Sequence, residues 1–244
     1  MHEEKDYGHV PVLLNECLDA LALRPDGVYV DGTLGRAGHS LEIAKRLTTG
    51  RLIGIDRDET AITAAEERLA DYMDRVTLVH SNFDRVGEIL DELGLDGADG
   101  MLFDLGVSSP QLDEAERGFS YMQDAPLDMR MNQRGALTAA RVVNGYPADA
   151  LTRLLGDWGE LETPWKIANC IVRAREAAPI ETTAQLVEAV KPCTPKKDES
   201  KFLTKLFQAL RIEVNGEMEA LRMALEQSLR VLRPGGRLVV ISYH

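Results

Sequence analysis

The sequence predicts an α/β fold in which a doubly wound, mostly parallel β-sheet is interrupted by a helical insert. Four short apolar runs before residue 110 each stop at a polar residue, which is typical of buried parallel strands. Helical patterns lie between these runs, and such strand–helix alternation predicts a parallel sheet. A fifth apolar run follows near the end of the sequence, after a long stretch with helical spacing and no comparable strand.

The sheet is therefore expected to contain five strands. A stripe of apolar residues from Val214 to Leu232 predicts a helix before the last strand. Pro234-Gly235-Gly236 is expected to end that helix. The predicted strands are Val28–Val30, Leu52–Ile55, Val76–Val79, Met101–Phe103 and Leu238–Ile241.

The length of 244 residues suits one α/β domain with an insert. We expect the α/β domain to comprise residues 1–109 and 212–244, and residues 110–211 to form a helical substrate-recognition insert. No apolar run approaches the ~20 residues that a membrane span needs. The start of the sequence is polar and acidic, unlike a signal peptide. We therefore expect a cytoplasmic protein with no membrane partner.

The three cysteines indicate neither a disulfide framework nor a metal site. Cys17, Cys170 and Cys193 are odd in number and far apart in the sequence. The chain contains no C-x-x-C motif and no cluster of Cys and His with the spacing of zinc ligands. Unpaired thiols in a reducing compartment are the expectation.

The charge of the chain bears on nucleic-acid binding in two opposing ways. A net charge of −12 argues against it, because phosphates favour Lys and Arg. The stretch from Lys191 to Arg211, however, holds six basic residues against two acidic ones. A basic face here could bind RNA, and an ordinary solvated helix surface is the alternative.

The first predicted strand runs into a glycine-rich loop, Asp31-Gly32-Thr33-Leu34-Gly35-Arg36-Ala37-Gly38-His39. Its glycines allow positive φ and the close approach of a ligand to the backbone. The next helix is expected to begin near Gly38, with free N–H groups facing that ligand. The spacing is G-x-x-G-x-x-G and differs from the G-x-G-x-x-G of dinucleotide folds.

Residues at the ends of the first three strands predict an adenosine-type cofactor. Asp56 ends the second strand and can accept hydrogen bonds from both ribose hydroxyls, as in dinucleotide enzymes. Phe83 follows the third strand and could pack on adenine, although a core role is the alternative. Asp31 would repel a pyrophosphate and attract a cationic amino-acid tail or a sulfonium. We therefore predict S-adenosylmethionine as the cofactor.

The fourth strand ends in Asp104-Leu105-Gly106-Val107-Ser108-Ser109-Pro110-Gln111, which resembles the Asp/Asn/Ser-Pro-Pro-Tyr/Phe motif of amino-group methyltransferases. An exocyclic amine shares its lone pair with its ring and is a poor nucleophile. Oxygen acceptors that bind its N–H groups free the lone pair, so catalysis is mostly positioning and charge compensation. The predicted catalytic residues are Asp104, Ser108, Ser109 and Pro110, with Gln111 as a further acceptor.

Two positions depart from that amino-methyltransferase motif. Gln111 replaces the second proline, and Leu112 replaces the aromatic residue. A ring that stacks on the target base would then have to come from Phe119 or Tyr121. A simple strand-to-loop turn is the structural alternative for this segment.

Over nearly its whole length the chain resembles the bacterial 16S ribosomal RNA cytosine-N4 methyltransferases, the MraW or RsmH family. Two of the matching stretches, Asp104–Ser120 and Pro126–Met131, are highly specific to that family. The other matching stretches are His9–Glu16, Asp31–His39, Gly54–Asp58, Phe207–Asn215 and Leu232–Ser242.

The resemblance implies a class I, Rossmann-like methyltransferase domain that uses S-adenosylmethionine. It implies transfer to N4 of a cytosine in the decoding region of 16S ribosomal RNA, with the RNA or the small ribosomal subunit as partner and a homodimer left open. Asp31 and Gly35 enter the predicted cofactor site from the residues alone. Carried over by motif, the cofactor contacts fall on Ala37, Gly38, His39, Asp56, Phe83, Asp104 and Gln111.

Three other functions stay open at this stage. A DNA cytosine-N4 methyltransferase would share the chemistry, and only the insert would distinguish it. A non-catalytic RNA- or ribosome-binding module is the alternative that a truncated end favours. A dinucleotide oxidoreductase is disfavoured by Asp31. The family usually continues beyond Ser242 with about two more strands, so we expect this chain to be a truncated form whose fifth strand lacks its usual neighbours.

Overall fold

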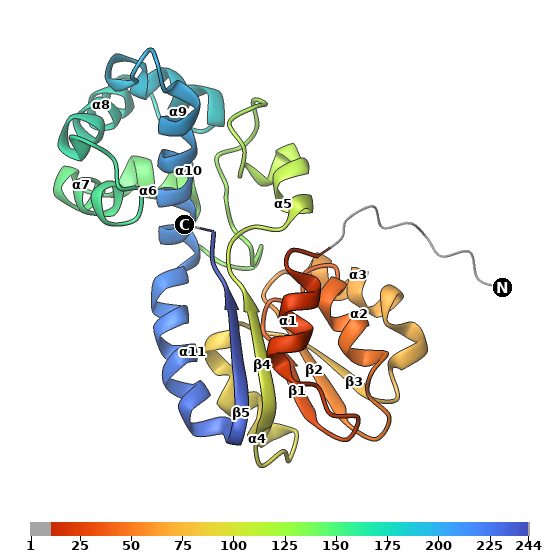
Figure 1. Ribbon diagram of the computed structural model, residues 1–244. Coiled ribbons are helices and arrows are strands. Elements are labelled where there is room, and N and C mark those ends of the chain that lie inside the picture. Colours follow the sequence, from red (N-terminus) through yellow and green to blue (C-terminus); the bar gives the residue numbers. More distant parts are fainter. Residues whose placement is uncertain (1–10, 244) are drawn as a thin grey trace. The chain divides into compact units, whose positions relative to one another are not determined.

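The computed structural model describes residues 11–243, and Figure 1 shows the chain. The polar start, His9, Val10 and His244 lie outside the described residues. The chain divides into two compact units, residues 1–106 with 219–244 and residues 107–218. Within residues 11–243 no helix is long and apolar enough to cross a membrane. A substrate-recognition role for the second unit stays a prediction.

The first unit contains a five-stranded sheet in the order β3-β2-β1-β4-β5, and every neighbouring pair is parallel. The prediction of a doubly wound parallel sheet is therefore confirmed. The strands are β1 (Val28–Asp31), β2 (Arg51–Asp56), β3 (Val76–His80), β4 (Ala98–Asp104) and β5 (Leu232–Ile241).

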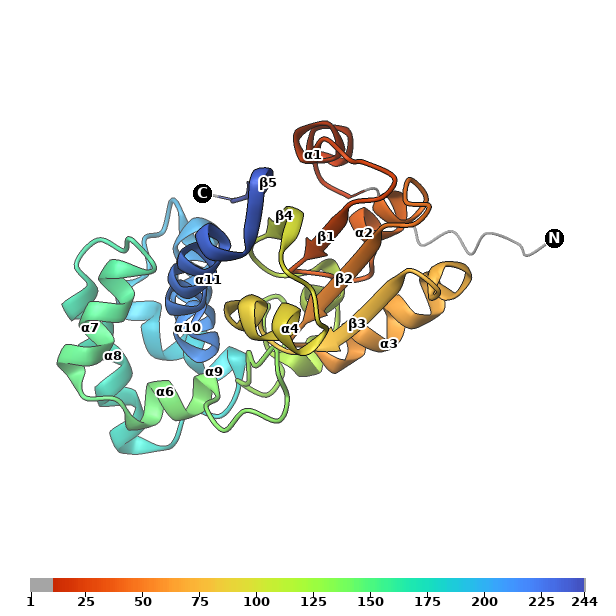
Figure 2. The same ribbon diagram turned by 90° about the horizontal axis from the view of Figure 1, so that it is seen from below.

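Helices cover both faces of this sheet (Figure 2). One face packs Leu21, Ile43 and Ala65 of three helices against the strands. The opposite face packs Ile89 and Ala224 of two others. The first group is α1 (Leu14–Leu21), α2 (Gly38–Ala44) and α3 (Glu59–Arg68), the second is α4 (Val86–Glu92) and α11 (Glu217–Val231), and the short 3₁₀ helices are η1 (Ala70–Tyr72) and η2 (Phe83–Arg85).

The strand order sets the place of the site. β1 pairs with β2 on one side and β4 on the other, so the strand order reverses at β1. In open parallel sheets, ligands bind at the carboxyl ends of the strands near such a reversal. The loops that follow β1, β2 and β4 therefore face one edge of the sheet, and these loops carry most of the predicted cofactor residues.

The predicted helix from Val214 to Leu232 is wrong at its start. Gly216 adopts a left-handed conformation (φ 57°) and separates α10 (Glu199–Asn215) from α11. The predicted apolar stripe is also not the buried face, because Leu229 is 86% exposed. The buried face of α11 consists of the smaller side chains Ala220, Ala224 and Ser228, which allow the helix to lie close to the sheet.

The last strand begins earlier than expected. β5 starts at Leu232, and Pro234-Gly235-Gly236 lies inside it rather than in a loop after the helix. The pairing with β4 is irregular here, since Ala98 faces Leu232 and Gly100 faces Arg237. β5 is at the edge of the sheet among the described strands, where proline and a bulge are tolerated.

The second unit is helical, as the spacing predicted, with one isolated bridge between Pro126 and Thr182. Its own core includes Leu151, Ile171, Leu186 and Leu206, all at helical positions. Its helices before α10 are α5 (Ser109–Asp113), α6 (Ala139–Gly145), α7 (Ala148–Asp157), α8 (Pro164–Ala177) and α9 (Thr183–Val190), with short 3₁₀ helices η3 (Ala115–Arg117) and η4 (Lys191–Cys193).

Candidate functional site

The glycine-rich loop after β1 is shaped by close backbone contacts. A Cβ on Gly32 would lie 2.4 Å from the Phe103 ring, so only glycine lets the loop pass over β4. Gly35 has φ 49°, and Ala37, which is fully buried, has φ 57°. Left-handed alanine is strained, and such strain is common in ligand-binding loops. Gly38 begins α2 and lies against Pro11, where a side chain would clash.

Asp31 is turned into the protein rather than toward the edge of the sheet. Its side chain is buried and accepts hydrogen bonds from the Ser40 hydroxyl (2.7 Å) and the Thr33 backbone N–H (3.2 Å). Burial raises the pKa of this carboxyl. Asp31 therefore holds the loop in shape, and a contact between its carboxylate and the cofactor stays a prediction.

Asp56 joins the end of β2 to the glycine-rich loop. Oδ2 accepts a hydrogen bond from the Gly35 N–H (2.8 Å), and Oδ1 accepts one from the Asp58 N–H (2.9 Å). Burial raises the pKa of Asp56 to about 6. Each carboxylate oxygen can accept a second hydrogen bond, so the side chain can still bind two ribose hydroxyls.

Phe83 follows β3 in η2 and is partly exposed. Its ring is tilted against the ring of Phe103, with 5.3 Å between the centroids. Phe83 therefore packs against a core residue, as the alternative interpretation predicted, and the residue is still partly exposed to solvent. Packing on adenine stays a prediction.

Asp104 ends β4 beside the same loop. Its backbone N–H donates to the Thr33 hydroxyl (2.6 Å), which fixes the end of the strand to the loop. Its Oδ1 atom is buried and has no hydrogen-bond partner among the described residues. Burial raises the pKa of Asp104, whereas the nearby His39 and a hydrogen bond from the Tyr243 hydroxyl lower it. A buried acceptor without a partner is costly and points to a ligand.

His39 lies within this polar group. The side chain is buried, and Nε2 is 3.0 Å from the carbonyl oxygen of Val12. Positive charge at the nearby His39 would lower the pKa of both Asp31 and Asp104. The imidazole therefore ties the segment before α1 to a position near the carboxylates at the ends of β1 and β4.

The residues of the first unit fit an adenosine cofactor with a cationic tail. Gly35, Ala37 and Gly38 offer backbone close to a ligand, and Asp56 offers acceptors for ribose. The unpartnered Oδ1 of Asp104 offers an acceptor at the same edge of the sheet. Thr33, Ser40 and Tyr243 support these groups and were not singled out from the sequence. A hydroxyl in a glycine-rich loop was the only signal that could have identified Thr33.

The predicted residues after Asp104 belong to the second unit. Ser109 and Pro110 form the first turn of α5. The buried Gln111 side chain accepts a hydrogen bond through Oε1 from the Ser108 N–H (3.1 Å) and so caps the helix. The structure thus gives Gln111 a capping role. Contacts of these four residues with cofactor or substrate stay predictions.

The two aromatic residues expected to stack on the target base have other roles. Phe119 is 6% exposed and belongs to the core of the second unit, so its ring cannot receive a base in this conformation. The Tyr121 ring meets Phe207 edge-on at 5.6 Å, and its hydroxyl lies 2.9 Å from the Ser200 hydroxyl. Neither residue supports the stacking expectation.

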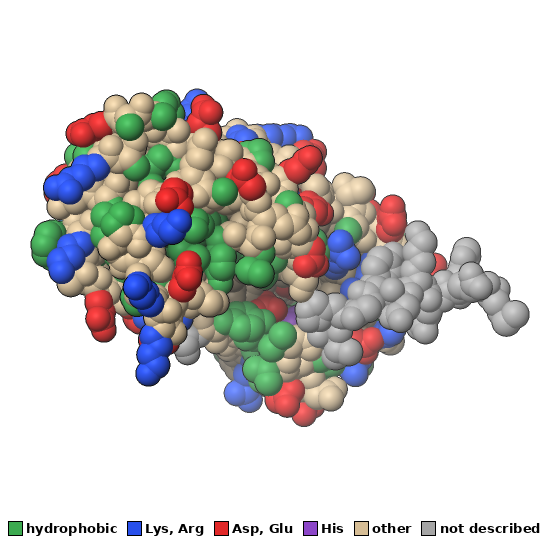
Figure 3. Space-filling view, turned by 90° about the horizontal axis from the view of Figure 1, so that it is seen from above, with side chains coloured by type: hydrophobic (Ala, Val, Ile, Leu, Met, Phe, Trp, Pro, Cys, Tyr) green, Lys and Arg blue, Asp and Glu red, His purple; other side chains and the backbone are tan. Residues whose placement is uncertain are grey.

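The basic stretch of the second unit is only partly available for RNA. Lys191 forms an ion pair with Glu188, and Arg211 forms one with Glu217. On the side of the molecule that Figure 3 shows, basic and acidic side chains are interspersed, and no large patch of one sign stands out. The exposed side chains of this stretch for which no ion pair is found within residues 11–243 are Lys196, Lys197 and Lys201.

The comparisons with known proteins identify the family. The MraW methylase family model matches residues 6–244. The protein named ribosomal RNA small subunit methyltransferase H from Symbiobacterium thermophilum is 52% identical, over 98% of this chain and 76% of that protein. The protein of the same name from Clostridioides difficile is 49% identical, over 98% of this chain and 78% of the relative.

Solved structures match at much lower similarity. An rRNA methylase from Streptococcus thermophilus is 18% identical, over 48% of this chain and 70% of that chain, with a TM-score of 0.34. The family is shown by the model match over almost the whole sequence, which agrees with the parallel sheet and its glycine-rich loop. The chain therefore belongs to the MraW methylase family, with a class I, Rossmann-like fold and S-adenosylmethionine as its cofactor.

Proposed function

We propose that the protein transfers a methyl group from S-adenosylmethionine to the exocyclic N4 amine of a cytosine in the decoding region of 16S ribosomal RNA. The observation that carries this proposal is the buried, unpartnered Oδ1 of Asp104 beside the glycine-rich loop. The names of the relatives support an RNA of the small ribosomal subunit as the substrate.

The chemistry needs an acceptor more than a strong base. Oδ1 of Asp104 can accept one N–H of the amine, which concentrates the lone pair on the nitrogen. Bound S-adenosylmethionine supplies the electrophilic methyl group. The nitrogen becomes acidic once it is alkylated, and its proton can pass to Oδ1. Burial raises the pKa of Asp104, so this carboxylate accepts a proton more readily than an exposed one.

The second acceptor for the amine is proposed to come from Ser108, Ser109 or the Pro110 carbonyl, which follow Asp104 in the sequence. We further propose that Lys196, Lys197 and Lys201 contact the RNA backbone. The proposed partner is 16S ribosomal RNA or the small ribosomal subunit, in the cytoplasm. A homodimer is a further proposal, which sedimentation would test.

One experiment tests the reaction and its alternatives. The protein is incubated with labelled S-adenosylmethionine and, separately, with 30S subunits, naked ribosomal RNA or duplex DNA. We expect label on cytosine N4 of the RNA. Label only on DNA would instead indicate a DNA cytosine methyltransferase. Cofactor binding without label on any substrate would indicate a non-catalytic RNA-binding module.

A further inference from the structure

Residues of two stretches, Asp104–Ser120 and Pro126–Met131, line a cavity that shares no residue with the predicted cofactor site. The cavity has a volume of about 550 Å³ and lies within the second unit. Small-molecule sites have volumes of about 300–1,000 Å³, so this one can hold a nucleobase. It is lined by Glu114, Ala115, Glu116, Arg117, Asp128, Arg130 and Gln133.

The two stretches are brought together by a backbone contact that only glycine permits. Gly118 has φ 70°, and a Cβ there would lie 2.2 Å from the Pro126 carbonyl oxygen. One residue earlier, the Arg117 carbonyl accepts a hydrogen bond from the Met129 N–H (3.0 Å). These contacts bring residues 114–117 close to residues 128–133, which line the same cavity.

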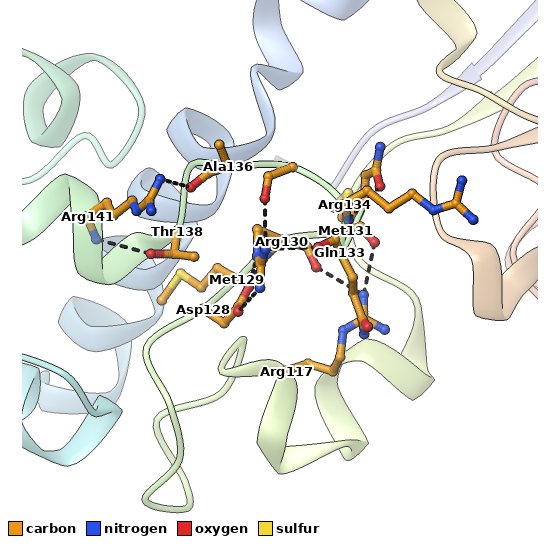
Figure 4. A network of polar contacts seen from close by, with 12 residues as sticks. Arg117, Asp128, Met129, Arg130, Met131, Gln133, Arg134, Ala136, Thr138 and Arg141 are labelled. Atoms are coloured by element: carbon orange, nitrogen blue, oxygen red, sulfur yellow. Dashed lines mark hydrogen bonds and ion pairs between the residues drawn. The ribbon is translucent and has the colours of Figure 1, made fainter.

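Two arginines that line the cavity, the buried Arg117 and the partly buried Arg130, are held by several hydrogen bonds (Figure 4). The Arg130 guanidinium donates to both carboxylate oxygens of Asp128 (2.8 and 2.6 Å) and to the Gln133 and Gly135 carbonyls (2.9 and 2.7 Å). Arg117 donates through Nη2 to the carbonyls of Arg130 (3.0 Å) and Met131 (3.1 Å). A site held this way needs little ordering when a ligand binds.

The buried side chain of Asn215 binds the backbone of residues 129–131, which lead into this lining. Its Oδ1 accepts from the Met131 N–H, and its Nδ2 donates to the Met129 carbonyl, both at 2.8 Å. Asn215 ends the long helix α10, so this backbone is tied to the core of the second unit.

The chemistry of the lining favours a flat ligand that donates hydrogen bonds. Three carboxylates and two guanidinium groups surround the cavity, an excess of negative charge that disfavours a phosphate. The side chains of Glu116 and Gln133 are not used in any hydrogen bond found within residues 11–243. Carboxylates accept hydrogen bonds from exocyclic amines, and guanidinium planes stack on the unpaired bases of RNA.

We propose that this cavity binds one unpaired nucleobase of the RNA substrate, a base that carries an exocyclic amine. Glu116 accepts the N–H groups of that amine, Gln133 donates to the neighbouring ring acceptor, and the base lies against the Arg130 guanidinium. This assignment rests on the proposed function, because it takes RNA as the substrate.

The test compares cytidine 5′-monophosphate with uridine 5′-monophosphate. The two bases differ at C4, which carries an amine in cytosine and a carbonyl oxygen in uracil, and at N3, which is an acceptor in cytosine and a donor in uracil. Binding to the 244-residue protein is followed by NMR titration of the nucleotide. We expect cytidine monophosphate to bind at least about fivefold more tightly, from a difference on the order of 1 kcal/mol per specific base contact. Glu116→Gln and Gln133→Ala should each reduce that preference to less than twofold. The control Glu176→Gln changes an exposed carboxylate of the same unit outside the cavity and should preserve it.

Equal binding of the two nucleotides to the native protein would overturn the assignment, as would a preference that survives both lining substitutions. Thermal unfolding of each variant checks that the fold is retained, which the exposure of Glu116 and Gln133 favours. Methylation of 30S subunits by the native protein separates the two proposals. If the native protein methylates 30S subunits but shows no nucleotide preference, the assignment of the cavity fails and the proposed reaction stands. If the variants abolish a nucleotide preference but no methylation is found, the proposed reaction fails and the assignment of the cavity stands.

Discussion

At the scale of one residue, we propose that the Asp56 carboxylate serves both the fold and the cofactor. It accepts the N–H groups of Gly35 and Asp58, and the ribose hydroxyls are its proposed further partners. Burial raises its pKa to about 6, so it is partly protonated in mildly acidic solution. A protonated carboxyl is a weaker acceptor for hydroxyl groups than a carboxylate.

The affinity for S-adenosylmethionine should therefore fall as the pH is lowered through about 6. Calorimetric titration between pH 5 and pH 8 measures this dependence. Asp56→Asn should lower the affinity by roughly tenfold or more, because it replaces a charged acceptor. It should also remove the pH dependence near 6. An affinity that stays constant across this range in the native protein would exclude Asp56 from the ribose site.

The same pKa predicts the opposite trend for the stability of the free protein. The folded pKa of about 6 lies above the value of 3.8 for an exposed carboxyl, so the folded state binds the proton more tightly. This contribution to stability is present below pH 4 and is lost as the pH rises to 6, by on the order of 3 kcal/mol. Urea unfolding of the native protein and Asp56→Asn, compared at pH 5 and pH 7, measures the part of this contribution that is still present at pH 5, roughly 1 kcal/mol.

Tyr243 is expected to influence the reaction through Asp104. Its hydroxyl donates to the Asp104 carboxylate and lowers the pKa of that group. Tyr243→Phe removes the donor, so the pKa of Asp104 should rise. The acidic limb of the pH–rate profile should then move to higher pH, with little change at pH 8. An unchanged profile would show that the hydroxyl does not act on the reacting carboxylate.

Sequence patterns select candidate residues for the site better than they predict the contacts that those residues make. Asp56 and the glycines were identifiable because their types and positions follow strand ends. The inward turn of Asp31 toward Ser40 depends on a residue in the following helix, and no local pattern encodes it. The missing partner of Asp104 Oδ1 is a property of the packed structure alone.

The elements were predictable where burial and hydrophobicity coincide. β1 and β4 are almost wholly buried and read as apolar runs in the sequence. In α11 the large side chains Leu225 and Leu229 are exposed, and Ala220 and Ala224 are buried. A count of hydrophobic residues therefore selects the wrong face of this helix, because close packing against the sheet requires small side chains.

The break between α10 and α11 gives a prediction about stability. Gly216 has φ 57°, a conformation that costs alanine about 1 kcal/mol. Gly216→Ala should lower the free energy of unfolding by about that amount, measured in urea. Gly145 ends α6 with an ordinary φ and no atom within 4 Å of a new Cβ, so Gly145→Ala is the matched control and should be neutral or slightly stabilising.

For the whole molecule, charge predicts how RNA binding responds to salt. Because the net charge is −12, the chain as a whole repels RNA, and phosphates must be bound by local groups of basic residues. Replacement of Lys196, Lys197 and Lys201 by Gln should weaken RNA binding. It should also reduce the salt slope by about 0.7 for each phosphate that the variant no longer neutralises. Lys191→Gln is the control, since Lys191 is paired with Glu188. An unaltered slope in the triple variant would make these lysines ordinary surface residues.

The division of the sheet between distant segments also has a consequence for synthesis of the chain. β4 ends at Asp104 and pairs with β5, which begins at Leu232, so the whole helical unit is made before β4 finds its last partner. Until then one edge of β4 stays open to other chains. The helical unit is built from contiguous sequence and can form first. A nascent chain halted before residue 232 should thus carry a folded helical unit and an aggregation-prone sheet, which limited proteolysis of stalled chains would detect.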